Sequence, residues 1–424
     1  MELCYRAKTE KGLSGQEILS GVLASIEGEK PKRALLLPPD FTRYHSNAGL
    51  ITNMYYHVLT DRGCNVDIMP ALGSHVPVTR EQADKMFGDI PFEKFIAHSW
   101  RNDVVQIGRV PGELISEWTG GLWTEPVTAE INRRVMEDCY DLIISVGQVV
   151  PHEVIGMSNH AKNLFVGVGG SDMINKSHMI GAVYGMERMM GRDHTPVRRL
   201  FDYCLENFIK DRHIIFALTV TTAPGGDICT HGLFIGDTRK VLEEAIALSQ
   251  KKNIDFVETG IRKCVVYLDP SEFRSTWLGN KAIYRTRMAI ADGGELLVLA
   301  PGVERFGEDA EMDRLIRRYG YRGRLKVLES FKESTELRQN MGAAAHLIHG
   351  SSDGRFRITY AVKSITQDEV RSVGFDAVSY SEAVKKYDPQ RLSYGYNSME
   401  DGEEIYFIPN PALGLWIDRE RFKN

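Results

Sequence analysis

The chain has 424 residues, 43% of them hydrophobic and 26% charged, a globular composition that excludes a disordered protein. Its formal net charge of −5, with no long basic run, speaks against a nucleic-acid or anionic-membrane partner and favours a small molecule. At this length we expect two or three domains.

The sequence also indicates a compartment. No segment approaches the roughly 18 consecutive apolar residues that a membrane helix needs, and the N-terminus lacks the apolar region of a signal peptide. The six cysteines are dispersed and form no CxxC pair, which favours reduced thiols. We therefore expect a soluble cytoplasmic protein.

Apolar runs alternate with amphipathic segments along the first part of the chain. Strands are predicted for RALLLPPD (33–40), NVDIMPALGSH (65–75), YDLIISVGQV (140–149), HIIFALTVTT (213–222) and KCVVYLDP (263–270). Helical spacing predicts helices over 47–63 and 237–253, the second with Asp237 as its N-cap. Strands separated by helices favour an α/β fold with a mostly parallel sheet.

A second series of elements begins near residue 275. It opens with a predicted helix over 281–294 and a strand over 295–302. We expect an N-terminal catalytic and cofactor-binding domain over 1–270 and a C-terminal α/β domain over 275–402, with the tail 403–424 returning to the first. The predicted fold is therefore α/β with two lobes, each a mostly parallel sheet flanked by helices, and an active site in the cleft between them.

Polar residues cluster where the predicted strands of the first domain end, which is where open α/β sheets bind ligands. The clusters contain Asp40, Thr42, Arg43 and His45 after the first strand, His75 after the second, and His152, His160, Lys162 and His178 after the third. A single such histidine is more often an ordinary hydrogen-bonded loop residue. Three histidine-bearing loops with a nearby Arg and Lys indicate a site.

Familiar site classes fit these residues poorly. The spacing of His152 and His160, without HxH, HExxH or CxxC, speaks against a zinc site, although a single His could bind a metal whose other donors come from a cofactor. GVGGSD (167–172) is not GxGxxG, so a nicotinamide cofactor has weak support. GxSxG, the mark of a serine nucleophile, is absent.

The ordered motifs resemble one known family. PPDFTR, ALGSH followed by VPVTREQ, and PHEVIGMSNHAK followed by GVGG and SH are similar to the lactate racemase family, and the similarity continues to SVGFDAVSYSEAV, covering roughly residues 33–411. The resemblance implies an isomerase, a racemase or epimerase that inverts C2 of a 2-hydroxy acid by hydride transfer. The implied cofactor is the nickel-pincer nucleotide, pyridinium-3,5-bisthiocarboxylate mononucleotide nickel, made by separate cofactor-synthesis proteins.

The resemblance also implies roles for individual residues. Lys162 would be joined to the cofactor, His178 would bind nickel, and His75 and His152 would be the two acid/base groups, a role that an ordinary His pKa near 6.5 suits. The remaining roles are implied for Asp40 and Thr42, which would hold the cofactor, and for Arg43 and Lys281, which would bind the substrate. A guanidinium can bind a carboxylate through two hydrogen bonds, which suits Arg43.

Two departures from the family pattern bear on the cofactor link at Lys162 and on the substrate. Asn159-His160-Ala161 stands before Lys162, where lactate racemases usually carry a Gly-Gly-Ser-type turn, and His160 adds an imidazole as a candidate substrate contact. WLGN (277–280) replaces a Tyr-Gln-type substrate contact, with Trp277 as the candidate here. We therefore expect a substrate longer than lactate, such as a sugar acid (aldonate).

Several alternatives stay open. The chain could act on lactate or another short-chain 2-hydroxy acid, or use the same histidines in a dehydrogenase or a lyase, which would show net redox or bond cleavage. A non-enzymatic sugar-acid or nucleotide-binding protein would bind its ligand without hydrogen exchange at C2. The sequence sets neither the oligomeric state nor the permanence of the link at Lys162.

Overall fold

The computed structural model describes residues 2–223, 226–412 and 414–423, which divide into two units. The first unit runs to Ile180 and resumes over Met189–Asn253. The second consists of Gly181–Arg188 and the chain from Ile254 onward. Among the described residues, no helix is both long enough and apolar enough to span a bilayer.

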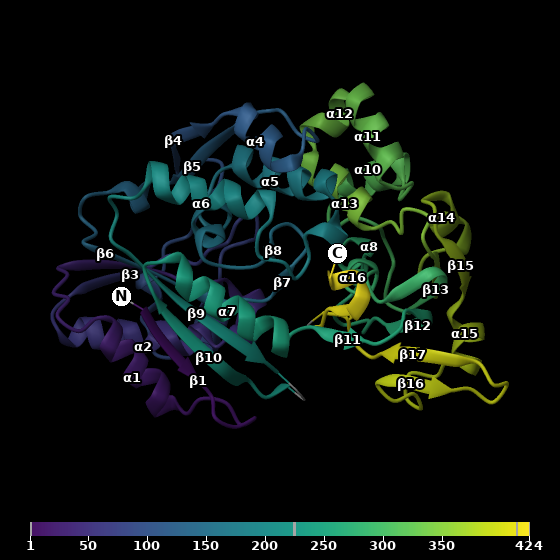
Figure 1. Ribbon diagram of the computed structural model, residues 1–424, viewed down its shortest axis with the longest axis horizontal. Helices are drawn as coiled ribbons and strands as arrows, with labels where there is room; N and C mark the ends of the chain where they lie inside the picture. Colours follow the sequence, from purple (N-terminus) through teal and green to yellow (C-terminus); the bar gives the residue numbers. More distant parts are fainter. Residues whose placement is uncertain (1, 224–225, 413, 424) are drawn as a thin grey trace. The chain divides into compact units, whose positions relative to one another are not determined.

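A six-stranded sheet forms the centre of the first unit (Figure 1). In sheet order its strands are β1 (Glu2–Arg6), β10 (Cys229–Gly236), β9 (Ile214–Thr222), β6 (Leu142–Gln148), β2 (Arg33–Leu37) and β3 (Asn65–Ile68). The strands from β9 to β3 are parallel to their neighbours, whereas β10 is antiparallel to both β9 and β1. The central strand β6 is almost entirely buried, as expected for a strand covered on both faces.

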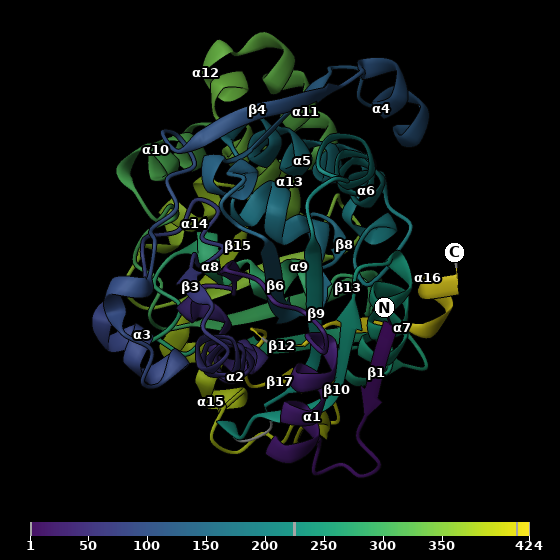
Figure 2. The same cartoon turned by 90° about the vertical axis from the view of Figure 1, so that its left-hand side faces the viewer.

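Helices cover both faces of this sheet. The helices of the first unit are α1 (Gly15–Ser25), α2 (Ala48–Asp61), α3 (Arg80–Phe87), α4 (Gly112–Thr119), α5 (Ser171–Tyr184, whose last turn belongs to the second unit), α6 (Pro196–Phe208) and α7 (Arg239–Lys252). Figure 2 shows α1 and α2 next to each other, and their apolar side chains pack on alternate residues of β9 and β10 such as Ala217 and Leu233. The intervening residues of β9 and β10, such as Gly232, face α7 on the opposite side of the sheet.

Two short hairpins and a π-helix complete the first unit. The hairpins pair β4 (Val104–Val110) with β5 (Val127–Asn132), and β7 (Pro151–His152) with β8 (Gly156–Met157). The π-helix spans Asn163–Gly167. Single π-type turns are rare and often lie at functional sites, and this one follows Lys162 directly.

The second unit contains another six-stranded sheet. In sheet order its strands are β15 (Asp376–Ser379), β14 (Arg357–Val362), β13 (Ile290–Ala300), β12 (Ile261–Tyr267), β17 (Glu404–Ile408) and β16 (Gly395–Ser398). Only the edge strand β16 is antiparallel to its neighbour. A separate parallel pair joins β11 (Asp255–Val257) and β18 (Trp416–Asp418).

The helices of the second unit are mostly short. They are α8 (Thr276–Gly279), α9 (Lys281–Tyr284), α10 (Ala310–Tyr319), α11 (Arg324–Glu333), α12 (Thr335–Gln339), α13 (Met341–His349), α14 (Gln367–Ser372), α15 (Tyr380–Lys386) and α16 (Arg419–Lys423). The mixed α/β fold with mostly parallel sheets, predicted from the alternation of apolar runs and helices, is confirmed.

Two predictions about the elements and two about the domains need correction. The helix over 281–294 ends at Tyr284, and its second half enters β13, which is buried between β12 and β14. The N-cap of α7 is Thr238 rather than Asp237. The division between the units falls at Asn253, not after 270, because β12 pairs inside the second sheet. The C-terminal strand β17 also pairs with β12, so the tail belongs to the second unit.

The short segment Gly181–Arg188 is tied to distant residues of its own unit. Glu187 Oε1 accepts hydrogen bonds from Arg287 Nε at 3.1 Å and from Arg355 Nε at 3.0 Å. Arg287 is buried, and a second carboxylate, that of Asp353, lies 3.2 Å from its Nη2. This buried guanidinium is therefore paired, as buried charges must be.

Candidate active site

A cavity of about 200 Å³ lies at the carboxyl edge of the first sheet. Parallel strands bring their carboxyl ends to one edge, so the loops after β2, β3 and β6 converge there. The lining includes seven of the residues singled out in the sequence: Asp40, Thr42, Arg43, His75, His152, Lys162 and His178. Segments more than a hundred residues apart thus contribute to one site, as the three polar clusters predicted.

The loop after β2 presents a carboxylate and a guanidinium in different ways. Asp40 is buried and caps a 3₁₀ turn, its Oδ1 accepting hydrogen bonds from Thr42 N at 2.9 Å and Thr42 Oγ1 at 2.5 Å. Arg43 is exposed, and its guanidinium makes no hydrogen bond or ion pair with the described residues, Asp40 included. Arg43 is thus available to bind an anionic group at the cavity.

His75 is oriented by Asp40. His75 Nδ1 lies 2.5 Å from Asp40 Oδ2, and a carboxylate can only accept, so the proton sits on Nδ1 and Nε2 carries a lone pair. Burial opposes ionisation of Asp40, but the hydrogen bonds from His75 and Thr42 outweigh it and hold the pKa of Asp40 below its usual value. The His75 side chain is 55% exposed, so Nε2 can reach a ligand and act as a base.

His152 has the opposite arrangement. The N–H of Val154 donates to His152 Nδ1 at 3.1 Å, so this nitrogen is unprotonated and the neutral ring carries its proton on Nε2. Burial holds the pKa of His152 well below 6.5, and the positive charges of Lys162 and Arg43 act in the same direction. The two histidines therefore present different atoms: a lone pair from His75 and an N–H from His152.

Lys162 is a cavity-lining amine without a hydrogen-bond partner among the described residues. Burial, helped by the charge of Arg43, lowers its pKa to about 8, so about one amine in ten is unprotonated at pH 7, far more than for an ordinary lysine. Just before it, Asn159 and His160 adopt left-handed φ angles of 70° and 58°. Such backbone costs about 1–3 kcal/mol per non-glycine residue and persists only where its surroundings hold it.

His178 has the geometry of a metal-binding histidine. It lies on α5, and its Nδ1 is 2.6 Å from the carbonyl of Ile174, which fixes the proton on Nδ1 and leaves the Nε2 lone pair open. Burial lowers the pKa of His178, which favours the neutral form that binds metals. Among the described residues, no group of three His, Cys, Asp or Glu side chains is arranged to hold a metal ion. A metal bound here would need its other donors from a cofactor.

Three residues predicted to contact the substrate are not among those that line this cavity. His160 is buried outside the cavity lining, with its ring stacked on Phe216 at a centroid distance of 3.8 Å, because its left-handed backbone turns it into the sheet. This corrects its prediction as a substrate contact. Trp277 and Lys281 belong to the second unit: Trp277 stacks on His346 at 4.1 Å, and the Lys281 amine lies 5.6 Å from the ring centre of Phe273.

The cavity also contains polar groups that the sequence did not point to. Glu153 lines it, and its Oε2 lies 3.7 Å from His152 Nδ1. Its position next to His152 in PHEV was the available signal. Gln148, Ser158 and Asn163 also line the cavity, although their side chains bond to neighbouring backbone or serine groups. Arg198 of α6 donates a hydrogen bond to the carbonyl of Asn159, in the turn before Lys162. Nothing in the sequence of this amphipathic helix pointed to that contact.

The second unit has a larger cavity of about 760 Å³, but several of its charged groups are paired with one another. Glu295 pairs with Lys263 and Arg357, and Glu403 also pairs with Lys263. It opens at the amino ends of β12, β13 and β14, the edge opposite to the one where parallel sheets bind ligands. The smaller cavity of the first unit is the candidate active site.

Comparisons with known proteins agree with this assignment. Residues 22–190, which include the seven cavity-lining residues named above, match the family model of the lactate racemase N-terminal domain. A protein from Thermotoga maritima of known crystal structure has the same fold, with a TM-score of 0.80 and 22% identity over 97% of this chain and 99% of that one. The lactate racemase apoprotein from Thermoanaerobacterium thermosaccharolyticum gives a TM-score of 0.71 and 16% identity over 96% and 93%.

Among curated proteins, no sequence matches the chain. At identities below 25% the two structures establish the fold alone, whereas the family model matches the sequence that builds the cavity. Residues 22–190 are therefore similar to the lactate racemase N-terminal domain, in agreement with the resemblance found in the sequence.

Proposed function

We propose that this chain is an isomerase that inverts C2 of a 2-hydroxy acid with the help of a nickel-pincer nucleotide. The observation that carries the proposal is the set of open groups around one cavity: the Lys162 amine, the Nε2 lone pairs of His75 and His178, and the free guanidinium of Arg43. An attachment amine, a metal ligand, a base and a carboxylate anchor are what such chemistry requires.

The residues fit this cofactor. Lys162, with its pKa lowered to about 8, supplies the unprotonated amine that a thioamide link needs, and His178 supplies one imidazole ligand to a metal held otherwise by the cofactor. Asp40 bonds to His75, which suggests that it orients this histidine in addition to contacting the cofactor. When bound, the cofactor would accept the C2 hydrogen as hydride and return it to the other face.

The chain's own residues would bind the substrate and move its hydroxyl proton. Arg43 would bind the substrate carboxylate through two hydrogen bonds, and His75 Nε2 would take the hydroxyl proton while Asp40 stabilises the imidazolium. His152, once protonated to the imidazolium, would deliver its Nε2 proton to the substrate oxygen and return to the neutral ring. Its protonated form needs an acceptor for Nδ1–H, and Glu153 Oε2 can serve once the bond from Val154 breaks. Each inversion then removes one proton at one histidine and delivers one at the other.

We further propose a substrate longer than lactate, such as an aldonate, with Trp277 and Lys281 contributing from the second unit. The support is that WLGN (277–280) differs from the short-substrate pattern. We place the protein in the cytoplasm, which suits its six cysteines, all free of disulfides.

The test compares protein made alongside cofactor-synthesis proteins with protein made without them. Intact-mass and metal analysis should show a mass addition at Lys162 and equimolar nickel only in the first, and Lys162→Arg should lose the addition. A C2-deuterated substrate should keep its label in the inverted product, because hydride returns to the same carbon. Binding of sugar acids with neither nickel nor an adduct would contradict the proposal and indicate a binding protein. Turnover of lactate alone would overturn the larger substrate.

A further inference from the structure

The turn before Lys162 is the most strained backbone in the part of the chain that the structure describes. Among the described residues, four that are not glycine have positive φ angles, namely Asn47, Asn159, His160 and Asp353. Only Asn159 and His160 are consecutive. Neither can relax as glycine would, because each carries a Cβ. Something in the fold must hold this turn.

Both side chains of the turn are anchored on the sheet. The Asn159 amide lies against Gly147 of β6, where an added Cβ would come within 2.1 Å of Asn159 Nδ2, so only glycine leaves room. Asn159 Oδ1 accepts from the N–H of His160 at 2.7 Å. The His160 ring stacks on Phe216 of β9, although neither ring nitrogen has a hydrogen-bond partner. His160 therefore anchors the turn by packing.

Arg198 holds the backbone of the same turn. It lies on α6, is 1% exposed, and donates from Nη2 to the carbonyl of Met157 at 2.7 Å and from Nη1 to the carbonyl of Asn159 at 3.2 Å. The nearest carboxylate, that of Asp202, is 4.0 Å away. A fully buried guanidinium aimed mainly at two carbonyls is a costly arrangement, which calls for a reason beyond filling space.

One oxygen connects Arg198 to Lys162. The carbonyl of Asn159 accepts from Arg198 and also from the backbone N–H of Lys162, at 3.4 Å. The guanidinium thus fixes the peptide that begins the turn, and the turn fixes where the Lys162 chain enters the π-helix Asn163–Gly167. A change at Arg198 can therefore reach Lys162 through this shared acceptor, in addition to the positive charge of Arg198, which also lowers the pKa of Lys162.

We propose that Arg198 is a positioning residue, which keeps the Lys162 amine in the cavity by holding the left-handed turn at Asn159 and His160. The proposal rests on the proposed function in one respect only, that Lys162 is the residue joined to the cofactor. It assigns Arg198 no contact with substrate or cofactor.

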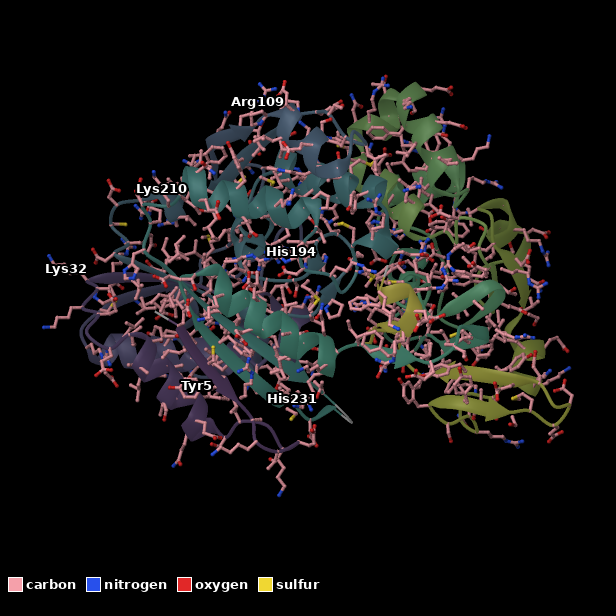
Figure 3. All side chains as sticks on the ribbon, in the orientation of Figure 1. Tyr5, Lys32, Arg109, His194, Lys210 and His231 are labelled. Carbon is pink, nitrogen blue, oxygen red and sulfur yellow. The ribbon has the colours of Figure 1, made fainter. Side chains whose placement is uncertain are left out.

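The experiment measures the reactivity of Lys162 in protein made without cofactor-synthesis proteins. Acetic anhydride is the probe, between pH 6 and 11, and peptide mass analysis gives the acetylation rate of Lys162 relative to Lys32 and Lys210. Both reference lysines are exposed at the surface of the first unit (Figure 3). Because the readout needs neither nickel nor turnover, failure of the proposed function would not change it.

For Arg198→Met we expect the relative acetylation of Lys162 at pH 8 to fall at least about tenfold, because an amine that leaves its buried position regains a pKa near 10.5 and is protonated at that pH. The matched control is Arg199→Met, which removes the exposed neighbouring guanidinium on α6 and should leave the rate unchanged. Arg198→Lys replaces the several donors of the guanidinium with one ammonium group, and it should give an intermediate rate of Lys162 acetylation.

Rescue separates positioning from general stability. Adding Asn159→Gly and His160→Gly to Arg198→Met should restore Lys162 acetylation to within about threefold of the parent, because glycine adopts the left-handed turn without strain. A lower melting temperature with an unchanged pH midpoint for Lys162, or a lost midpoint that the glycines do not restore, would overturn the proposal. If Arg198→Met does not fold, the same comparison is made with Arg198→Lys, with and without the two glycine substitutions. The pH midpoint of Lys162 acetylation is again the quantity compared.

Discussion

Two histidine-containing clusters, one in each unit, differ in what their polar groups do. In the cavity of the first unit, Arg43 and Lys162 have no polar partner among the described residues, and His75 keeps its Nε2 open. In the second unit, the Tyr321 hydroxyl lies 2.9 Å from both Thr276 Oγ1 and His346 Nε2, and the ring of Trp277 stacks on His346. Burial and polarity alone would not separate the two clusters. The two clusters differ in the number of polar atoms at the cavity that have no hydrogen-bond partner among the described residues.

The largest expected effect belongs to the first cluster. His75→Asn removes the proposed base, so kcat/KM for inversion should fall by about 100- to 10,000-fold. The matched control is His57→Asn, which changes a surface histidine of the first unit that also pairs with a carboxylate, Asp89, and should stay within about twofold of the parent. Steady-state rates measured by polarimetry on cofactor-loaded protein decide this. Similar rates for both variants would remove His75 from the mechanism.

Stability should show the reverse pattern. Tyr321→Phe leaves Thr276 and His346 without a buried hydroxyl partner, and the free energy of unfolding should fall by about 1–3 kcal/mol. Arg43→Ala removes an exposed side chain without a partner and should change it by less than about 0.5 kcal/mol. Urea unfolding curves of both variants test the contrast. A larger loss for Arg43→Ala would mean that the open groups of the cavity also hold the fold together.

The smallest effect concerns pH. Burial lowers the pKa of His346 to about 3, so between pH 3 and 6.5 the unfolded chain binds a proton that the folded chain does not. Stability must then fall as the pH drops below 6.5, and the fall ends near the folded pKa. His346→Gln should flatten the dependence of unfolding free energy on pH between 4.5 and 6.0, by on the order of 1 kcal/mol per pH unit. A slope equal to that of the parent protein would show that His346 is protonated in the fold.

The sequence predicted the edge of the sheet where the cavity lies, for a physical reason. Short apolar runs such as 33–40 and 140–149 are typical of buried parallel strands, and polar residues directly after such strands meet at one edge. His75 and His152 were found this way. Which ring nitrogen carries the proton in each histidine was not predictable. It depends on contacts with Asp40 and with the N–H of Val154, which only the folded loops create.

Failures of the sequence analysis came from non-local pairing and from backbone handedness. Residues 281–294 have helical spacing, but β13 begins at Ile290, which pairs with Ile261 of β12, and the sheet pairing outweighs the local pattern. His160 was expected at the substrate because it lies two residues before Lys162 in the chain. Its positive φ turns the ring away from the cavity and onto Phe216, and no spacing rule reveals such an angle for a residue that is not glycine.

The ion pairs of Glu187 have a consequence for the protein's synthesis. The second unit includes Gly181–Arg188, which leaves the ribosome well before its partners, since Glu187 and Arg355 are 168 residues apart. At about 5–20 residues per second, this segment waits roughly 10–30 seconds for the chain that completes its surroundings. A nascent chain arrested after Asn253 would display Glu187 without Arg287 and Arg355, so this segment cannot reach its final pairing until the second unit has been made.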